Sequence, residues 1–131
     1  MTYDFSVSTE LPAAPDAVYD TWMSSEGHTS MTGGRADVDP RIGGRFEAWD
    51  GYITGVTLDL EPGRRIVQSW RTSDFTDCDE DSQIEVVLEP SSGGCAIFLH
   101  HTNVPDGHRG YEDGGWEDNY FAPMRTFFTR P

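Results

Sequence analysis

A chain of 131 residues with 36% hydrophobic and 12% aromatic residues is long enough to bury one core and too apolar to be disordered. We therefore expect a single folded domain over residues 1–131. The formal net charge is −14, because 23 acidic residues face 9 basic ones, all of them arginine. Such a charge repels nucleic acid and anionic membranes, which excludes both as expected partners.

The N-terminus MTYDFSVSTE has neither a basic start nor an apolar stretch, and no run of 18 apolar residues occurs. We therefore predict a protein that neither spans a membrane nor is exported. Cys78 and Cys95 lack metal-binding or CxxC spacing, which favours reduced thiols and a cytoplasmic location. The excess of acids suggests a halophilic protein from a salt-rich cytoplasm, and an ordinary acidic cytosolic protein is the alternative.

The first third of the chain predicts one strand and two short helices. Tyr3, Phe5, Val7, Thr9 and Leu11 alternate with polar residues, which is the period of a strand with one buried face. Pro15 can occupy the first turn of a helix whose apolar stripe includes Val18 and Trp22. A second short helix is expected over residues 26–32, ended by Gly33 and Gly34.

The middle of the chain predicts an antiparallel meander, because short apolar runs recur about every ten residues between turn signals. Asp50-Gly51 is a signal for a two-residue hairpin, and Glu61-Pro62-Gly63 predicts the next turn. The acidic segment 74–81 predicts a solvated loop, since its spacing misses the template of a calcium loop. The expected strands are residues 36–39, 45–49, 52–60, 64–71, 83–88 and 95–102.

The C-terminal segment changes period. Trp116, Tyr120 and Met124, with Phe127 or Phe128, recur at steps of three and four residues, so they predict a helix beginning near Gly115. Pro123 removes one amide hydrogen bond and predicts a kink near residues 119–123. A long helix after about seven strands is typical of an α+β helix-grip fold, in which a curved antiparallel sheet wraps around the C-terminal helix.

These segments also resemble a known family. The resemblance rests on GGRFEAWDGYITGVTLDLEPGRRIVQSWR, IEVVLEP, HHTNVPD, GGWEDNYFAPMRTFF and the earlier WMSSEGHTSMTGG, and it spans nearly the whole chain. The chain resembles the activator of heat-shock-protein-90 ATPase homologue family of the START-like (SRPBCC) superfamily. The resemblance implies a helix-grip fold with a hydrophobic cavity, usually no bound metal, and, by analogy with the eukaryotic activator, a chaperone as a partner.

His101 is one candidate for a functional residue. Cys95, Ile97, Leu99 and His101 share one face of the last expected strand, and this row is expected to face inward, with His100 on the opposite face. The resemblance places the histidine common in the family's final strand at this position. His101 would either exchange a proton with a polar ligand group or be satisfied by neighbouring protein groups.

Aromatic residues with a polar tip suit a ligand pocket, although they equally suit an ordinary core. Gln68 is in register with Ile66 and Trp70, so it would need a polar partner from protein, water or ligand if it is buried. We predict no catalytic residue, no metal ligand and no cofactor. The predicted ligand-binding residues are Trp49, Tyr52, Gln68, Trp70, His101, Trp116, Tyr120 and Met124.

Three functions remain open. The first is non-enzymatic binding of a small hydrophobic or aromatic molecule between the sheet and the C-terminal helix. The second is a protein-interaction module that activates the ATPase of a chaperone of the heat-shock-protein-90 type. The third is an enzyme similar to a cyclase or aromatase, for which the sequence offers no convergent acid and base. The chain is expected to be a monomer or a homodimer.

Overall fold

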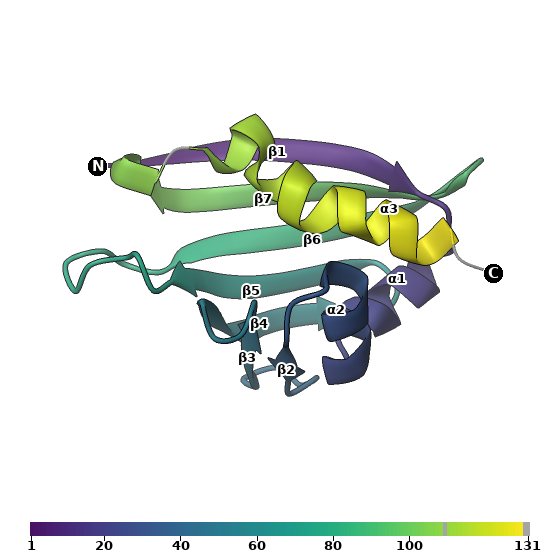
Figure 1. Ribbon diagram of the computed structural model, residues 1–131, viewed down its shortest axis with the longest axis horizontal. Coiled ribbons are helices and arrows are strands. Elements are labelled where there is room, and N and C mark those ends of the chain that lie inside the picture. Colours follow the sequence, from purple (N-terminus) through teal and green to yellow (C-terminus); the bar gives the residue numbers. More distant parts are fainter. Residues whose placement is uncertain (109, 130–131) are drawn as a thin grey trace.

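The computed structural model describes residues 1–108 and 110–129. Within this part of the chain, seven strands form one antiparallel sheet in the order β1-β7-β6-β5-β4-β3-β2 (Figure 1). The predicted meander is therefore confirmed, since β2 to β7 are neighbours in chain order. The strands are β1 Thr2–Leu11, β2 Asp37–Val38, β3 Arg45–Ala48, β4 Ile53–Glu61, β5 Arg65–Thr72, β6 Ser82–Ser91 and β7 Gly94–Pro105.

The first strand joins the sheet beside the last one. Val7 pairs with Leu99 and Phe5 with His101, and on its other side His101 pairs with Ile84 of β6. Because side chains alternate across a strand, Ile97, Leu99 and His101 all point to the buried face, as predicted. His100 points the other way and contacts Ser6 of β1.

Two short helices follow β1, as predicted. Helix α1 is Pro15–Trp22 and begins with proline, and α2 is Ser25–Thr32. The hydroxyl of Ser24 accepts a hydrogen bond of 2.8 Å from the amide of Gly27, which satisfies a free donor at the start of α2. Gly33 ends α2 with a φ of 87°, a left-handed conformation that favours glycine.

The C-terminal helical segment differs from the prediction at its start. Helical turns begin at Tyr111 rather than near Gly115, and Gly114 interrupts them with a φ of 127°. A π-helical turn then precedes the last α-helix, and it lies just before Pro123, which cannot donate to the carbonyl of Asn119. The elements are η1 Asp106–His108, η2 Tyr111–Gly115, η3 Glu117–Phe121 and α3 Ala122–Thr129.

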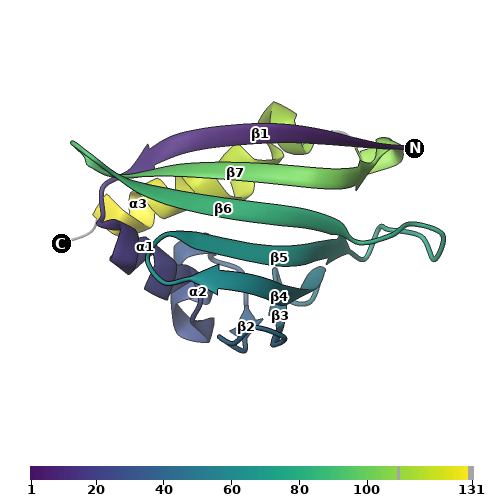
Figure 2. The same cartoon turned by 180° about the vertical axis from the view of Figure 1, so that it is seen from behind.

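The core lies between the sheet and the helices. The C-terminal segment crosses one face of the sheet, α1 and α2 lie on the same face, and the reverse view shows the strands of the other face uncovered (Figures 1 and 2). Ile84, Leu99, Trp22, Phe121 and Met124 are buried there, and burying each such side chain contributes roughly 1.5–3 kcal/mol. This arrangement confirms the helix-grip fold predicted from the sequence.

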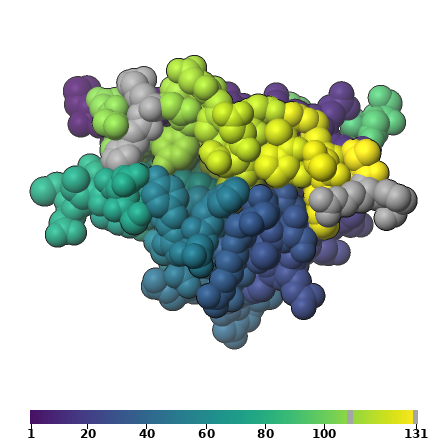
Figure 3. Space-filling model, viewed as in Figure 1, coloured from purple at the N-terminus to yellow at the C-terminus, as the bar shows by residue number. Residues whose placement is uncertain are grey.

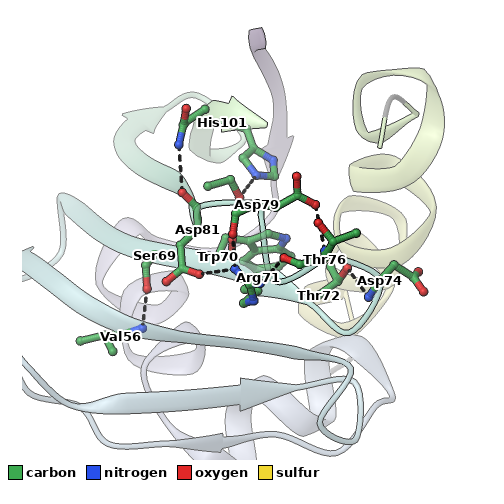
Figure 4. A network of polar contacts seen from close by, with 12 residues as sticks. Val56, Ser69, Trp70, Arg71, Thr72, Asp74, Thr76, Asp79, Asp81 and His101 are labelled. Atoms are coloured by element: carbon green, nitrogen blue, oxygen red, sulfur yellow. Dashed lines mark hydrogen bonds and ion pairs between the residues drawn. The ribbon is translucent and has the colours of Figure 1, made fainter. Parts of the chain in front are cut away.

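One turn differs from expectation, whereas the acidic segment 74–81 forms a loop of mostly exposed residues, as predicted. The β3–β4 connection has four residues, 49–52, because Trp49 and Asp50 adopt positive φ values of 51° and 58° and leave the ladder after Ala48. The acidic loop 74–81 is organised by Arg71, whose guanidinium donates to the carbonyls of Thr76 and Asp79 (Figure 4).

Over residues 1–108 and 110–129, none of the helices has the length and the apolar character that a membrane-spanning helix requires.

Candidate functional site

A cavity of about 560 Å³ lies where the C-terminal segment meets the sheet. Its walls come from the 49–52 loop, the adjoining ends of β4 and β5, and the turns from Gly110 to Tyr120. Figure 3 shows this side of the molecule, with the C-terminal segment in lime and yellow above the blue residues of α2 and the steel-blue and teal residues of β3 to β5. The lining residues are Trp49, Tyr52, Ile53, Trp70, Thr72, Gly110, Tyr111, Gly115, Trp116, Asn119 and Tyr120.

The structure brings some of the sequence-predicted site residues to this cavity and leaves others behind its wall. Those that line it are Trp49, Tyr52, Trp70, Trp116 and Tyr120. Gln68, His101 and Met124 do not line it. They are buried, with 1%, 0% and 0% of their surface exposed.

Sequence reasoning missed several lining residues. Ile53 and Thr72 are partners across β4 and β5, so the pairing register brings both to the mouth of the cavity. Tyr111 and Gly115 lie one helical turn apart, so both can face the cavity. The helix predicted from the sequence begins near Gly115 and therefore does not include Tyr111 among the helical residues. The glycine pair at 114 and 115 argued against an earlier helical start, because helices often end at a glycine in the left-handed conformation.

His101 is held by neighbours on both ring nitrogens. The Ser82 hydroxyl donates to the carbonyl of Trp70, so its oxygen accepts from Nε2–H of His101 at 2.9 Å. Nδ1 then accepts from the indole N–H of Trp116 at 3.2 Å. Burial lowers the pKa of His101 to about 3, which keeps the ring neutral. His101 therefore orients Trp116 and has no free nitrogen for a ligand.

A second buried histidine stands behind Tyr120. Nδ1–H of His28 donates to the carbonyl of Trp22 at 2.9 Å, and Nε2 accepts from the Tyr120 hydroxyl at 2.8 Å. Burial lowers the pKa of His28 to about 4, although the bond to Trp22 opposes the shift, and burial raises the pKa of Tyr120. Local sequence patterns do not predict this pair, because its members are 92 residues apart.

Gln68 finds its partners within the protein. Its side-chain oxygen accepts from the indole N–H of Trp22 at 3.1 Å, and its amide nitrogen donates to the Thr57 hydroxyl at 3.2 Å. The side chain is in register with Ile66 and Trp70 on the buried face, as predicted. Because both ends of the amide are bonded, Gln68 needs no ligand to satisfy it.

Three aromatic rings form one continuous wall of the cavity. Ring centroids are 4.8 Å apart for Trp70 and Trp116, 5.0 Å for Trp116 and Tyr120, and 6.0 Å for Trp70 and Tyr120. The planes are tilted by 42° to 60°, a range typical of aromatic clusters. Aromatic side chains held this closely offer a preformed apolar surface.

The open side of the cavity carries phenols. Tyr52 is 43% exposed and donates to the Asp74 carboxylate at 2.6 Å, a bond that raises the pKa of the phenol. Burial raises the pKa of Tyr111, and the nearby Trp70 indole and Thr72 hydroxyl oppose that shift. The Trp70 N–H nevertheless has no partner within hydrogen-bond geometry.

Trp49 is held at the rim by backbone constraints. Its φ of 51° is unusual for a bulky residue and turns the side chain out of the strand. The indole packs directly against Gly34, where a Cβ atom would collide with the ring. Gly34 is therefore required for this placement of Trp49. Strained backbone of this kind is found preferentially at functional sites.

Comparison with known proteins identifies relatives across nearly the full chain. The family model described as "Activator of Hsp90 ATPase homolog 1-like protein" matches residues 12–128. An uncharacterized protein of Schizosaccharomyces pombe is 24% identical over 97% of this chain and 38% of its own length. The activator of 90 kDa heat shock protein ATPase homolog of Dictyostelium discoideum is 23% identical over 98% of this chain and 33% of its own. The chain thus spans about a third of the length of the curated relatives it matches.

Solved structures share the fold at low sequence identity. An HSP90 activator from Plasmodium falciparum superposes with a TM-score of 0.84 and 22% identity over 98% of both chains. CalU16 from Micromonospora echinospora gives a TM-score of 0.78 and 23% identity over 96% of this chain and 76% of its own. At this identity the likeness shows a shared fold, and fold alone does not specify function.

Proposed function

We propose that this chain, which belongs to the family of proteins like activator of Hsp90 ATPase homolog 1, binds a small hydrophobic or aromatic molecule in the cavity between its sheet and its C-terminal segment. The observation that carries the proposal is the cavity of about 560 Å³ walled by Trp70, Trp116 and Tyr120. Pockets of about 300–1,000 Å³ lined by aromatic side chains are typical of small-molecule sites.

The positions of the buried polar groups support binding rather than catalysis. Both nitrogens of His101 and both nitrogens of His28 are engaged in hydrogen bonds. Among the described residues that line the cavity there is no carboxylate, histidine or cysteine. A cyclase or aromatase needs a free acid and base within hydrogen-bond reach of its substrate, so the geometry favours a binder.

Titration with the uncharged fluorescent dye N-phenyl-1-naphthylamine tests this function. Saturable binding is expected, with an affinity lost in Trp116→Leu and weakened in Tyr52→Ala, since both residues line the cavity. Met124→Leu is the matched control, because Met124 is fully buried but lies outside the lining. Absence of saturable binding by the folded wild-type protein, or equal loss in all three variants, would refute the proposal.

Activation of a chaperone ATPase is the second candidate, favoured by the curated relatives and by the structural neighbour named as HSP90 activators. Here the partner would bind the outer surface, so the activity would survive Trp116→Leu. To distinguish the chaperone role from small-molecule binding, the full chain is added to the chaperone of the same organism, and the rate of ATP hydrolysis is measured. Stimulation unaffected by the cavity variant would favour the chaperone role.

A further inference from the structure

The aromatic side chains around the cavity turn their polar tips into the protein. The Trp116 N–H donates to His101, the Tyr120 hydroxyl donates to His28, and the Tyr52 hydroxyl donates to Asp74. These donors are therefore already used. These three side chains can therefore contact a ligand through the carbon atoms and the π faces of their rings.

The other two tryptophans that line the cavity lead to the same conclusion. The indole nitrogens of Trp49 and Trp70 are inaccessible and have no hydrogen-bond partner, so neither N–H reaches a molecule in the cavity without rearrangement. The polar groups that remain belong to Thr72, Tyr111 and Asn119. The Asn119 amide nitrogen donates to the carbonyl of Gly115, which leaves the amide oxygen for a ligand. The hydroxyls of Thr72 and Tyr111 can turn their oxygens toward a positive charge.

The charged side chains seen to hydrogen-bond to described lining residues of the cavity are carboxylates. No ionised side chain occurs among the described lining residues, so an anionic ligand would lose hydration without gaining a countercharge. Asp74 bonds Tyr52, and the Glu112 carboxylate accepts from the amide of Gly110 at 3.3 Å, so carboxylates touch two lining residues. The net charge of −14 adds a field that attracts cations.

From these observations we infer that the ligand of this cavity carries a positive and weakly hydrated group, such as a quaternary ammonium, next to its apolar part. The negative faces of aromatic rings attract such a cation, and the tilted wall of Trp70, Trp116 and Tyr120 provides several faces at once. This inference rests on the proposed function and narrows it to a charge class.

Three probes that share a benzyl group test the inference. They are benzyltrimethylammonium, its uncharged isostere neopentylbenzene, and the anion phenylmethanesulfonate. Binding to the full chain is measured by tryptophan fluorescence at low salt and at about 1 M salt, where charges are screened within about 3 Å. We expect the cation to bind about tenfold tighter than the isostere, as a desolvated cation–π contact predicts, and the anion not to bind.

The carboxylate contribution is tested separately with Asp74→Asn. This variant should weaken binding of the cation by about threefold and leave the isostere unchanged, since only the charge is removed. Asp77→Asn removes the same charge from an exposed position in the same loop and is the control. If both variants weaken binding of the cation equally, the loss comes from the net charge of the protein, and a local contribution of Asp74 is ruled out.

The outcomes separate this inference from the function on which it rests. If N-phenyl-1-naphthylamine binds and the cation has no advantage over neopentylbenzene, the charge preference is overturned while the cavity remains a binding site. If neither the dye nor any probe binds, both proposals fall. A cation advantage that disappears in Trp116→Leu and persists in Met124→Leu supports both.

Discussion

At the scale of single residues, two buried histidines shape the wall of the cavity from behind. His101 orients Trp116 and His28 orients Tyr120, and each ring is neutral because burial lowers its pKa. Both act as positioning residues for aromatic side chains. The two histidines therefore contribute to the stability of the fold and to the shape of the cavity.

This placement predicts a pH dependence of stability. In the unfolded chain a histidine binds a proton near pH 6.5, whereas folded His28 and His101 do so only near pH 4 and pH 3. Between these values the unfolded state holds more protons, so the free energy of unfolding falls as pH drops below about 6.5. Each histidine contributes a slope of about 1.4 kcal/mol per pH unit. Urea unfolding between about pH 7.5 and pH 5 measures it, and a stability that is flat over this range would contradict it.

Replacing His101 and His100 in turn tests whether the buried histidine, and not the adjacent one on the outer face, stabilises the protein. His101→Leu leaves the buried Trp116 N–H without an acceptor, so we expect a loss of about 2 kcal/mol in the free energy of unfolding. His100→Leu is the control, because His100 lies on the outer face, and should change stability by less than about 0.5 kcal/mol. The pH slope should also fall by about half in His101→Leu only.

At the scale of elements, loops and helix ends place the aromatic residues. Gly34 packs against Trp49, so Gly34→Ala forces the indole to move and should reduce both stability, by about 1–3 kcal/mol, and dye affinity. Gly107→Ala is the matched control, because a Cβ there meets no neighbour and the backbone needs no positive φ. If a folded Gly34→Ala variant binds the dye as tightly as the wild type, dye binding does not depend on the position of the Trp49 indole.

The cap of α2 offers a second test at this scale. Ser24→Ala removes the hydroxyl that accepts from the amide of Gly27, and should lower the free energy of unfolding by about 1 kcal/mol. Ser30→Ala lies on the exposed side of the same helix and should be neutral or slightly stabilising, because alanine has the higher helix propensity. Thermal or urea unfolding of both variants decides between a cap and a general effect of serine.

At the scale of the whole molecule, the charge of −14 is the dominant feature. Like charges on one surface repel, and salt relieves the repulsion as the screening length shortens from about 10 Å at 0.1 M to about 3 Å at 1 M. We expect the melting temperature to rise by several degrees between these concentrations of KCl, as the halophile hypothesis requires. A melting temperature that does not rise would favour an ordinary acidic protein.

The sequence by itself determined the order of the elements and their inward faces, apart from the start of the C-terminal helical segment and the turn between β3 and β4. The alternation from Tyr3 to Leu11, the proline at 15 and the spacing of Trp116, Tyr120 and Met124 each reflect local geometry, which a short stretch of sequence encodes. The fold class followed from these patterns, and the alternation along residues 64–71 and 95–102 placed Gln68 and His101 on the same faces as their apolar neighbours, which the structure shows to be buried.

Only the tertiary structure decided what those side chains face. His28 meets Tyr120 across 92 residues and Gln68 meets Trp22 across 46, contacts that depend on the docking of helices onto the sheet. The same docking brings Tyr111 to the cavity and leaves His101 and Met124 behind its wall. Periodicity specifies which face of an element is buried, whereas the position along that face depends on packing between distant segments.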